Sequence, residues 1–162
     1  KMIGYWFTQL LFGIRVLHSK NILHRDLKSA NIFLTKNYSL KIGDFGISKV
    51  LEHSSAITCI GTPLYLSPEV CNNMPYGFSS DLWALGCILY ELVTGALPFD
   101  YEYPGDLLVK HVTEPPVPPR EHLPSVEPAV EAFILRCLVK DPADQLACGP
   151  CGEAFAVQAA FG

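Results

Sequence analysis

His24-Arg25-Asp26-Leu27-Lys28-Ser29-Ala30-Asn31 is the stretch that decides the fold, and Asp44-Phe45-Gly46 follows it in the same chain. The octapeptide is polar and charged, so it is predicted to be a loop. The short apolar runs 32–34 and 40–42 lie on either side of Asn37-Tyr38-Ser39, a pattern that predicts a β-hairpin.

Composition limits the classes of protein. The chain has 162 residues, 49% of them hydrophobic, and a formal net charge of −4, which favours one globular domain without nucleic acid as a partner. The most apolar stretch, 82–93, contains Glu91 and falls short of the roughly 20 residues of a membrane span, so no membrane partner is expected. No signal-peptide pattern opens the chain, and the six cysteines are expected to be reduced thiols of a cytoplasmic protein.

Periodicity predicts helices around this loop. Apolar residues recur every three or four positions over 1–19, and another apolar helix is predicted to begin at the N-cap Ser79-Ser80-Asp81 and to end at Gly95. Residues 43–69 have no sustained period and should be irregular. The fold class is therefore mainly α with a short β-hairpin. Further predictions are a helix around 105–112, an extended connector over 115–119 and a helix marked by Val130 to Leu138 that Pro142 ends.

The octapeptide and the Asp-Phe-Gly triplet together resemble the catalytic loop and the metal-binding triplet of protein kinases. The resemblance implies ATP and Mg²⁺ as cofactors and Asp26 as the base for a substrate hydroxyl. Lys28 would stabilise the transferring phosphate, and Asn31 and Asp44 would bind magnesium through oxygen. Phe33 would form the floor of the adenine pocket, so Lys28, Asn31, Phe33 and Asp44 are the expected nucleotide-binding residues.

Residues 44–69 resemble an activation segment that ends in Ser67-Pro68-Glu69, the wording typical of NIMA-related kinases. By this resemblance Thr62 bridges the catalytic Asp and Lys, as in serine/threonine kinases. Thr58 aligns with the activating phosphosite, and Arg25 would clamp the phosphate there. The expected partners are ATP, protein substrates with Ser or Thr, and an upstream activating kinase unless the protein phosphorylates itself.

The same resemblance implies structural roles. His24 and Phe45 would stack into the hydrophobic column that joins the two lobes. Asp81 would hold the backbone of the catalytic loop, with an N-cap role as the alternative. Glu69 would pair with an arginine, but the chain has Gln145 at that position; loss of one partner of a buried pair typically costs about 3–5 kcal/mol, which a neutral hydrogen bond from Gln145 could soften.

The expected domain division is a partial kinase domain over 1–144, comprising the C-terminal large lobe only, and a divergent tail over 145–162. The tail contains Cys148-Gly-Pro-Cys151, the wording of thioredoxin's active site, but no strand leads into it, so redox activity is not expected. The chain begins inside a helical pattern and lacks the glycine-rich loop and ATP-anchoring lysine, which predicts an absent N-terminal lobe and an inactive isolated chain.

Two functions remain open from the sequence. The first is a serine/threonine protein kinase that transfers the γ-phosphate of ATP in the intact enzyme. The second is a non-catalytic, truncated product that acts as a protein-binding module. The family resemblance further suggests association with the centrosome, the cilium or the cytoskeleton.

Overall fold

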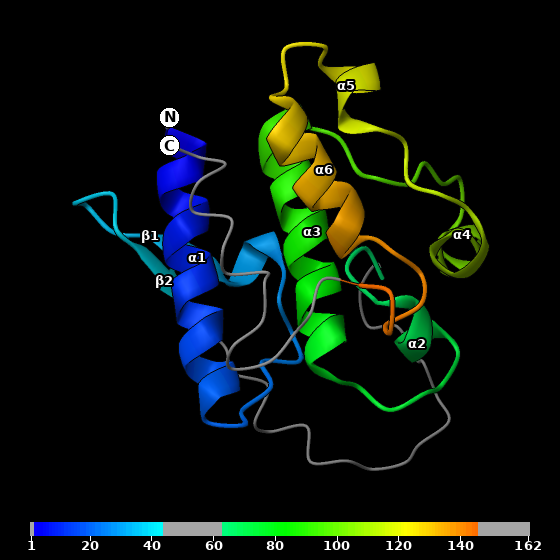
Figure 1. Ribbon diagram of the computed structural model, residues 1–162, viewed down its shortest axis with the longest axis horizontal. Helices are drawn as coiled ribbons and strands as arrows, with labels where there is room; N and C mark the ends of the chain where they lie inside the picture. Colours follow the sequence, from blue (N-terminus) through cyan, green and yellow to red (C-terminus); the bar gives the residue numbers. More distant parts are fainter. Residues whose placement is uncertain (1, 44–62, 146–162) are drawn as a thin grey trace.

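The computed structural model describes residues 2–43 and 63–145, and it is mostly helical with one small sheet (Figure 1). This confirms the predicted fold class. The helices are α1 (Met2–Ser19), α2 (Pro68–Cys71), α3 (Phe78–Thr94), α4 (Pro104–Thr113), α5 (Pro119–His122) and α6 (Pro128–Cys137), with a 3₁₀ turn η1 (Ser29–Asn31). The strands are β1 (Ile32–Leu34) and β2 (Leu40–Ile42).

Helix α3 is the centre of the core. All of its residues from Ser80 to Tyr90 are buried, as expected for a helix that is apolar nearly all round. Helices α1 and α6 lie alongside it (Figure 1), and their buried faces contribute Phe7, Leu10 and Ile134 to the same core. At the α3–α6 contact a Cβ on Gly86 would lie 2.7 Å from the Cβ of Cys137, so only glycine allows this close approach.

The ends of α3 test two predictions. The predicted N-cap over 79–81 is wrong, because the helix begins at Phe78 and its N-cap residue is Gly77. The hydroxyl of Ser80 instead accepts a hydrogen bond from the Gly77 amide at 3.3 Å, and Asp81 lies inside the first turns. The predicted end is confirmed, because Gly95 follows the helix with φ 71°, a left-handed conformation that glycine adopts without a Cβ penalty.

The predicted hairpin is confirmed, and α1 holds it in place. β1 and β2 pair antiparallel with Ile32 opposite Ile42. The side-chain oxygen of Gln9 on α1 accepts a hydrogen bond from the Leu40 amide at 2.9 Å, and the Trp6 indole donates to the Tyr38 carbonyl at 3.2 Å. The hairpin therefore returns the chain to the end of η1 in a fixed position.

Four helices begin with a proline within their first turn, where its missing N–H costs nothing: α2, α4, α5 and α6. α4 confirms the helix predicted around 105–112. α6 confirms the last predicted helix, but it ends at Cys137 and not at Pro142. The connector predicted over 115–119 is extended only up to α5, and the irregular segment predicted up to 69 ends where α2 begins.

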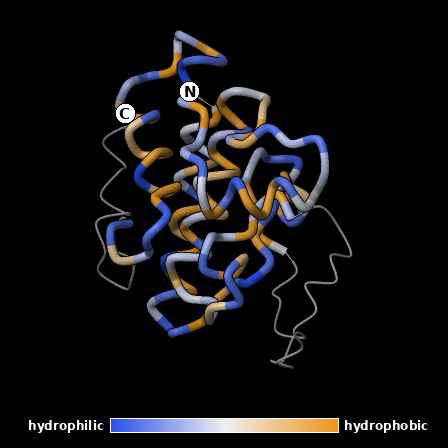
Figure 2. Tube along the Cα trace, turned by 90° about the vertical axis from the view of Figure 1, so that its right-hand side faces the viewer, coloured by the Kyte–Doolittle hydropathy of each residue, from blue (hydrophilic) through white to orange (hydrophobic). Residues whose placement is uncertain are grey.

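The hydropathy of the chain follows this packing. Figure 2 shows hydrophobic positions gathered along the central helices and hydrophilic positions along the outer loops. In the two described ranges, no helix is both long and apolar enough to cross a bilayer. Cys87 and Cys137 are buried in the core and Cys71 is half-buried, whereas Cys59, Cys148 and Cys151 lie outside the described residues.

Candidate active site

The loop after α1, together with η1, brings Asp26 and Lys28, which were predicted to be catalytic, into contact with Asn31, which was predicted to bind magnesium. The Lys28 ammonium lies 3.0 Å and 3.3 Å from the two carboxylate oxygens of Asp26. The amide nitrogen of Asn31 donates to the backbone carbonyl of Asp26 at 2.8 Å and to its carboxylate at 3.0 Å. Asp26 and Lys28 are each 39% exposed, so the pair faces solvent on one side. A proton acceptor, a cation and an amide thus lie within contact of one another.

Asn31 is positioned for a second task. It is 5% exposed, and its backbone carbonyl accepts a hydrogen bond from the Gly43 amide at 2.9 Å. Because the amide nitrogen of its side chain is committed to Asp26, its Oδ1 atom is the side-chain atom left to bind a cation. The contact with Gly43 also joins the end of β2 to the loop, immediately before Asp44 in the sequence.

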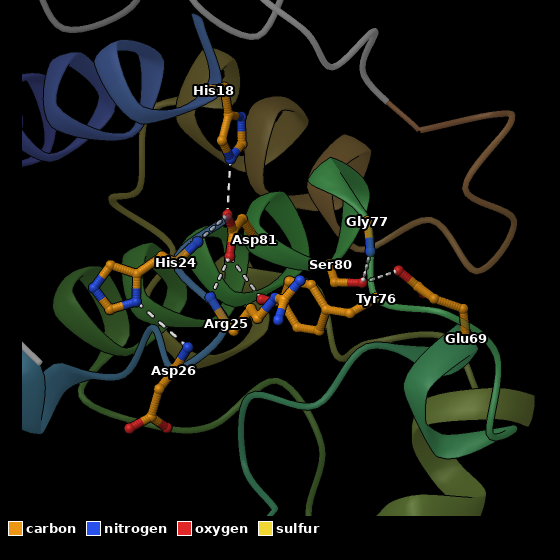
Figure 3. A network of polar contacts seen from close by, with 9 residues as sticks. All are labelled: His18, His24, Arg25, Asp26, Glu69, Tyr76, Gly77, Ser80 and Asp81. Carbon is orange, nitrogen blue, oxygen red and sulfur yellow. Dashed lines mark hydrogen bonds and ion pairs between the residues drawn. The ribbon is translucent and has the colours of Figure 1, made fainter. Parts of the chain in front are cut away.

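Asp81 on α3 anchors the backbone of the loop (Figure 3). Its carboxylate accepts hydrogen bonds from the backbone amides of His24 and Arg25, at 3.0 Å and 3.2 Å. These are the contacts expected of Asp81. Arg25 has φ 69°, a left-handed conformation that costs a non-glycine residue roughly 1–2 kcal/mol. The bond from its amide to Asp81 stabilises that strained turn, which leads directly to Asp26.

Two further donors reach the same carboxylate, and sequence reasoning missed both. The Tyr76 hydroxyl donates to Asp81 at 2.7 Å, and the Nε2 atom of His18 lies 2.8 Å from its other oxygen (Figure 3). Both His18 and Asp81 are fully buried. His18 does leave a signal, because it continues the buried face of α1 that Leu10 and Ile14 define. Tyr76 leaves none, because its role depends on a contact that only the folded chain makes.

The electrostatics keep Asp81 ionised. Burial alone would raise the pKa of Asp81, but the hydrogen bonds from His18, Tyr76 and the two backbone amides lower it overall. Burial, followed by the charge of Asp81, raises the pKa of Tyr76 well above its ordinary value. The carboxylate therefore remains an acceptor and the phenol remains a donor at neutral pH.

His24 connects the loop to the hairpin. Its ring is buried, its Nδ1 atom accepts a hydrogen bond from the Asp26 amide at 3.4 Å, and its Nε2 atom lies 3.2 Å from the Gly43 carbonyl. This arrangement assigns the ring proton to Nε2, since Nδ1 acts as the acceptor. The predicted stacking partner Phe45 lies outside the described residues, as do Asp44, Thr58 and Thr62.

Two predicted residues near the site in sequence have exposed side chains. Phe33 on β1 is 51% exposed. Arg25 is exposed, and within the described residues its guanidinium makes no hydrogen bond or ion pair. Both side chains are thus accessible to a ligand, and the roles predicted for them stay predictions.

Glu69 and Gln145 do not form the contact that a buried pair would require. The Glu69 carboxylate accepts hydrogen bonds from the hydroxyls of Ser79 and Ser80. Gln145 donates to the Cys137 carbonyl, and its own side-chain oxygen has no partner within the described part of the chain. The hydrogen bond expected of Gln145 is therefore made, but to the end of α6 and not to Glu69.

Comparisons with known proteins agree with this geometry. The family model of the protein kinase domain matches residues 1–154. Serine/threonine-protein kinase Nek1 of Mus musculus is 49% identical over 118 residues, which are 70% of this chain and 10% of that protein. Nek5 of Homo sapiens is 51% identical over 108 residues (65% and 15%), and Nek4 of Mus musculus is 44% identical over 124 residues (75% and 16%).

The chain thus spans between 10% and 16% of the length of these three relatives. The predicted boundary between a kinase part and a divergent tail at residue 144 stays a prediction. The match over nearly the whole sequence and the identities of 44–51% settle the family. The chain belongs to the protein kinase family and, within it, resembles the Nek serine/threonine kinases.

Proposed function

We propose that the protein containing this chain is a serine/threonine protein kinase that transfers the γ-phosphate of ATP to hydroxyls of protein substrates. The observation that carries the proposal is the convergence of Asp26, Lys28 and Asn31 within hydrogen-bond distance of one another. Phosphoryl transfer needs mainly positioning and neutralisation of charge, and this constellation can provide both.

Asp26 is proposed to accept the proton of the attacking hydroxyl. Its carboxylate is partly exposed, so a substrate can reach it. Hydrogen bonds to its backbone carbonyl and to its carboxylate from Asn31 fix its orientation. Lys28, in contact with the same carboxylate, is proposed to move its ammonium toward the transferring phosphate and stabilise the negative charge there.

The donor set fits magnesium. Mg²⁺ prefers oxygen ligands, and the remaining oxygen of the Asn31 amide supplies one, with Asp44 proposed as another. Magnesium, when bound, would neutralise phosphate charge. Among the residues that the structure describes, no group of three or more His, Cys, Asp or Glu side chains could hold a metal ion, so the site would depend on these ligands and on phosphate oxygens.

Arg25 and Thr58 are proposed to regulate the enzyme. The exposed guanidinium of Arg25 follows the buried His24, at the turn that Asp81 stabilises. A phosphate on Thr58, added by an upstream kinase or by the protein itself, would bring roughly −1.5 to −2 charges and three acceptor oxygens for this cation. Because Arg25 precedes Asp26 directly, such a contact would restrain the catalytic loop.

The test is a phosphotransfer assay on the intact protein and on its Asp26→Asn variant. Loss of the base is expected to lower incorporation of phosphate into a Ser/Thr peptide by about 100-fold or more. Asp106→Asn, on the exposed start of α4, is the matched control and should retain wild-type activity. Equal incorporation by the wild type and the Asp26→Asn variant would refute the role of Asp26, and no incorporation by the wild type would refute the proposed activity.

A further inference from the structure

A chain of three polar side chains crosses the exposed side of the catalytic loop. The hydroxyls of Ser29, in η1, and of Tyr65, in the segment before α2, lie 2.9 Å apart. The Tyr65 hydroxyl also lies 2.7 Å from the carboxylate of Glu91 on α3. Three elements that are far apart in the sequence thus meet through one phenol oxygen.

The phenol determines the direction of these hydrogen bonds. Burial, with smaller contributions from Glu91, raises the pKa of Tyr65 to about 12, so its hydroxyl keeps its proton at physiological pH. A carboxylate can only accept, so the Tyr65 hydroxyl donates to Glu91 and its oxygen accepts the proton of the Ser29 hydroxyl. Each hydrogen bond in such a chain polarises and strengthens the next one.

The two sides of the catalytic loop are held differently. On the inner side Asp81 accepts hydrogen bonds from two backbone amides of the loop, and the Asn31 side chain donates a hydrogen bond to the Asp26 carbonyl. On the outer side Ser29 is exposed, and within the described ranges its bond to Tyr65 is the one hydrogen bond between residues 24–31 and residues 63–67. The position of the segment before α2 relative to Lys28, the neighbour of Ser29, therefore depends on this contact.

We propose that Ser29 is a positioning residue for the protein substrate. The inference rests on the proposed kinase function. A substrate hydroxyl must approach Asp26 from its exposed side, because the buried side chains of His24 and Asn31 close the other side. Through Tyr65, Ser29 sets the distance between the loop that carries Asp26 and the facing segment. We therefore expect its loss to affect the protein substrate rather than the nucleotide.

The experiment compares Ser29→Ala, Ser29→Thr and Tyr65→Phe in the intact protein, with a Ser/Thr peptide as substrate. Loss of the Ser29 hydroxyl is expected to lower kcat/KM for the peptide about three- to tenfold, the worth of one hydrogen bond. The KM for ATP and the melting temperature should not change. Ser29→Thr, which keeps the hydroxyl, should restore peptide kinetics, and the double variant Ser29→Ala/Tyr65→Phe should be no worse than Tyr65→Phe alone.

Three outcomes would overturn the inference while the proposed function stands. They are wild-type peptide kinetics for Ser29→Ala, a parallel rise in the KM for ATP, and a Ser29→Thr variant as impaired as Ser29→Ala. An inactive wild-type protein would instead overturn the proposed function and this inference with it. Activity that is lost in Asp26→Asn but unchanged in Ser29→Ala separates the two cases.

Discussion

Two acidic residues near the first turns of α3 accept different numbers of hydrogen bonds. Asp81 is fully buried and accepts hydrogen bonds from His18, Tyr76 and two backbone amides. Glu69, in α2 beside the same end of the helix, accepts from two serine hydroxyls. Near Glu69 in sequence, the buried hydroxyl of Ser67 has no partner within the described part of the chain. We call these two regions the Asp81 network and the Glu69 corner.

The difference shows where polar contacts stabilise the fold. A buried carboxylate with four hydrogen-bond donors is rigid and costly to disturb. Asp81 is such a carboxylate, and it binds the backbone of the loop that carries Asp26. The Glu69 carboxylate has two serine hydroxyls as donors within the described residues. The buried hydroxyl of Ser67 and, elsewhere in the domain, the buried side-chain oxygen of Gln145 have no partner there. Unpaired buried groups cost about 1–3 kcal/mol each. The proposed catalytic geometry should thus be more resistant to perturbation than the corner.

Asp81→Ala should have the largest effect on stability. It removes the acceptor from four donors that are at least partly buried, the ring of His18 among them, which should lower the free energy of unfolding by about 3–5 kcal/mol. Urea unfolding of the domain measures this loss. Asp106→Ala, at an exposed site on α4, is the matched control and should be nearly neutral. A loss for Asp81→Ala as small as the control's would contradict the assignment of the network as the anchor of the loop.

The Asp81 network should also shape the stability at acidic pH. The pKa of Asp81 is lowered from its ordinary value of 3.8 in the folded protein. Its contribution is therefore complete above the unfolded pKa and is lost as pH falls through the folded pKa. In Asp81→Ala the free energy of unfolding should therefore lack this loss at acidic pH.

His111 contacts the segment that leads to the Glu69 corner, and it should make the stability of the fold depend on pH. Its buried ring donates from Nδ1 to the Leu66 carbonyl at 2.7 Å, and burial lowers its pKa to about 4 from 6.5. Between these two values the unfolded chain binds a proton that the folded chain does not. Stability should therefore fall by about 3 kcal/mol as pH drops from 6.5 to 4.

The measurement is the free energy of unfolding of His111→Gln at several pH values between 4 and 6.5. The glutamine can still donate to Leu66 but does not titrate, so this part of the pH dependence should flatten. His122→Gln, at an exposed position, is the matched control for the substitution itself. An unchanged slope for His111→Gln would show that His111 does not titrate as the buried geometry requires.

The smallest effect on stability is expected for Gln145→Arg, which tests the Glu69 corner. Gln145→Arg should give Glu69 a cationic partner and raise the free energy of unfolding by about 1 kcal/mol, since desolvation of the arginine offsets most of the gain. In a Glu69→Gln background the same substitution should destabilise the domain. A double-mutant cycle measures the coupling, and additive effects would mean that an arginine at 145 does not reach Glu69.

The long elements of the fold were predictable because their patterns are local. α1 and α3 have the apolar spacing of helices, Gly95 marks the end of α3, and the hairpin has two short apolar runs around a turn. α2 and α5 were not predicted, because each has four residues, too few to show a period. The N-cap of α3 was misplaced because Ser79, Ser80 and Asp81 are ordinary cap residues whose side chains are engaged elsewhere.

The candidate site was predictable only in part. Asp26, Lys28 and Asn31 lie within one short stretch, so their spacing, together with the resemblance to a kinase catalytic loop, predicted that they meet. The support beneath them could not be found in this way, because His18 lies 63 positions before Asp81 in the sequence. The link from Ser29 to Tyr65, 36 positions away, is equally non-local. Residues that act through the fold rather than through a motif leave little trace in a single sequence.

The most direct test is a crystal structure of the intact protein with magnesium and a non-hydrolysable ATP analogue. We expect the terminal phosphate to lie between Asp26 and Lys28, with the Lys28 ammonium at hydrogen-bond distance from a phosphate oxygen. We also expect magnesium roughly 2.0–2.1 Å from the side-chain oxygen of Asn31. A nucleotide whose terminal phosphate contacts none of Asp26, Lys28 and Asn31 would contradict this expectation.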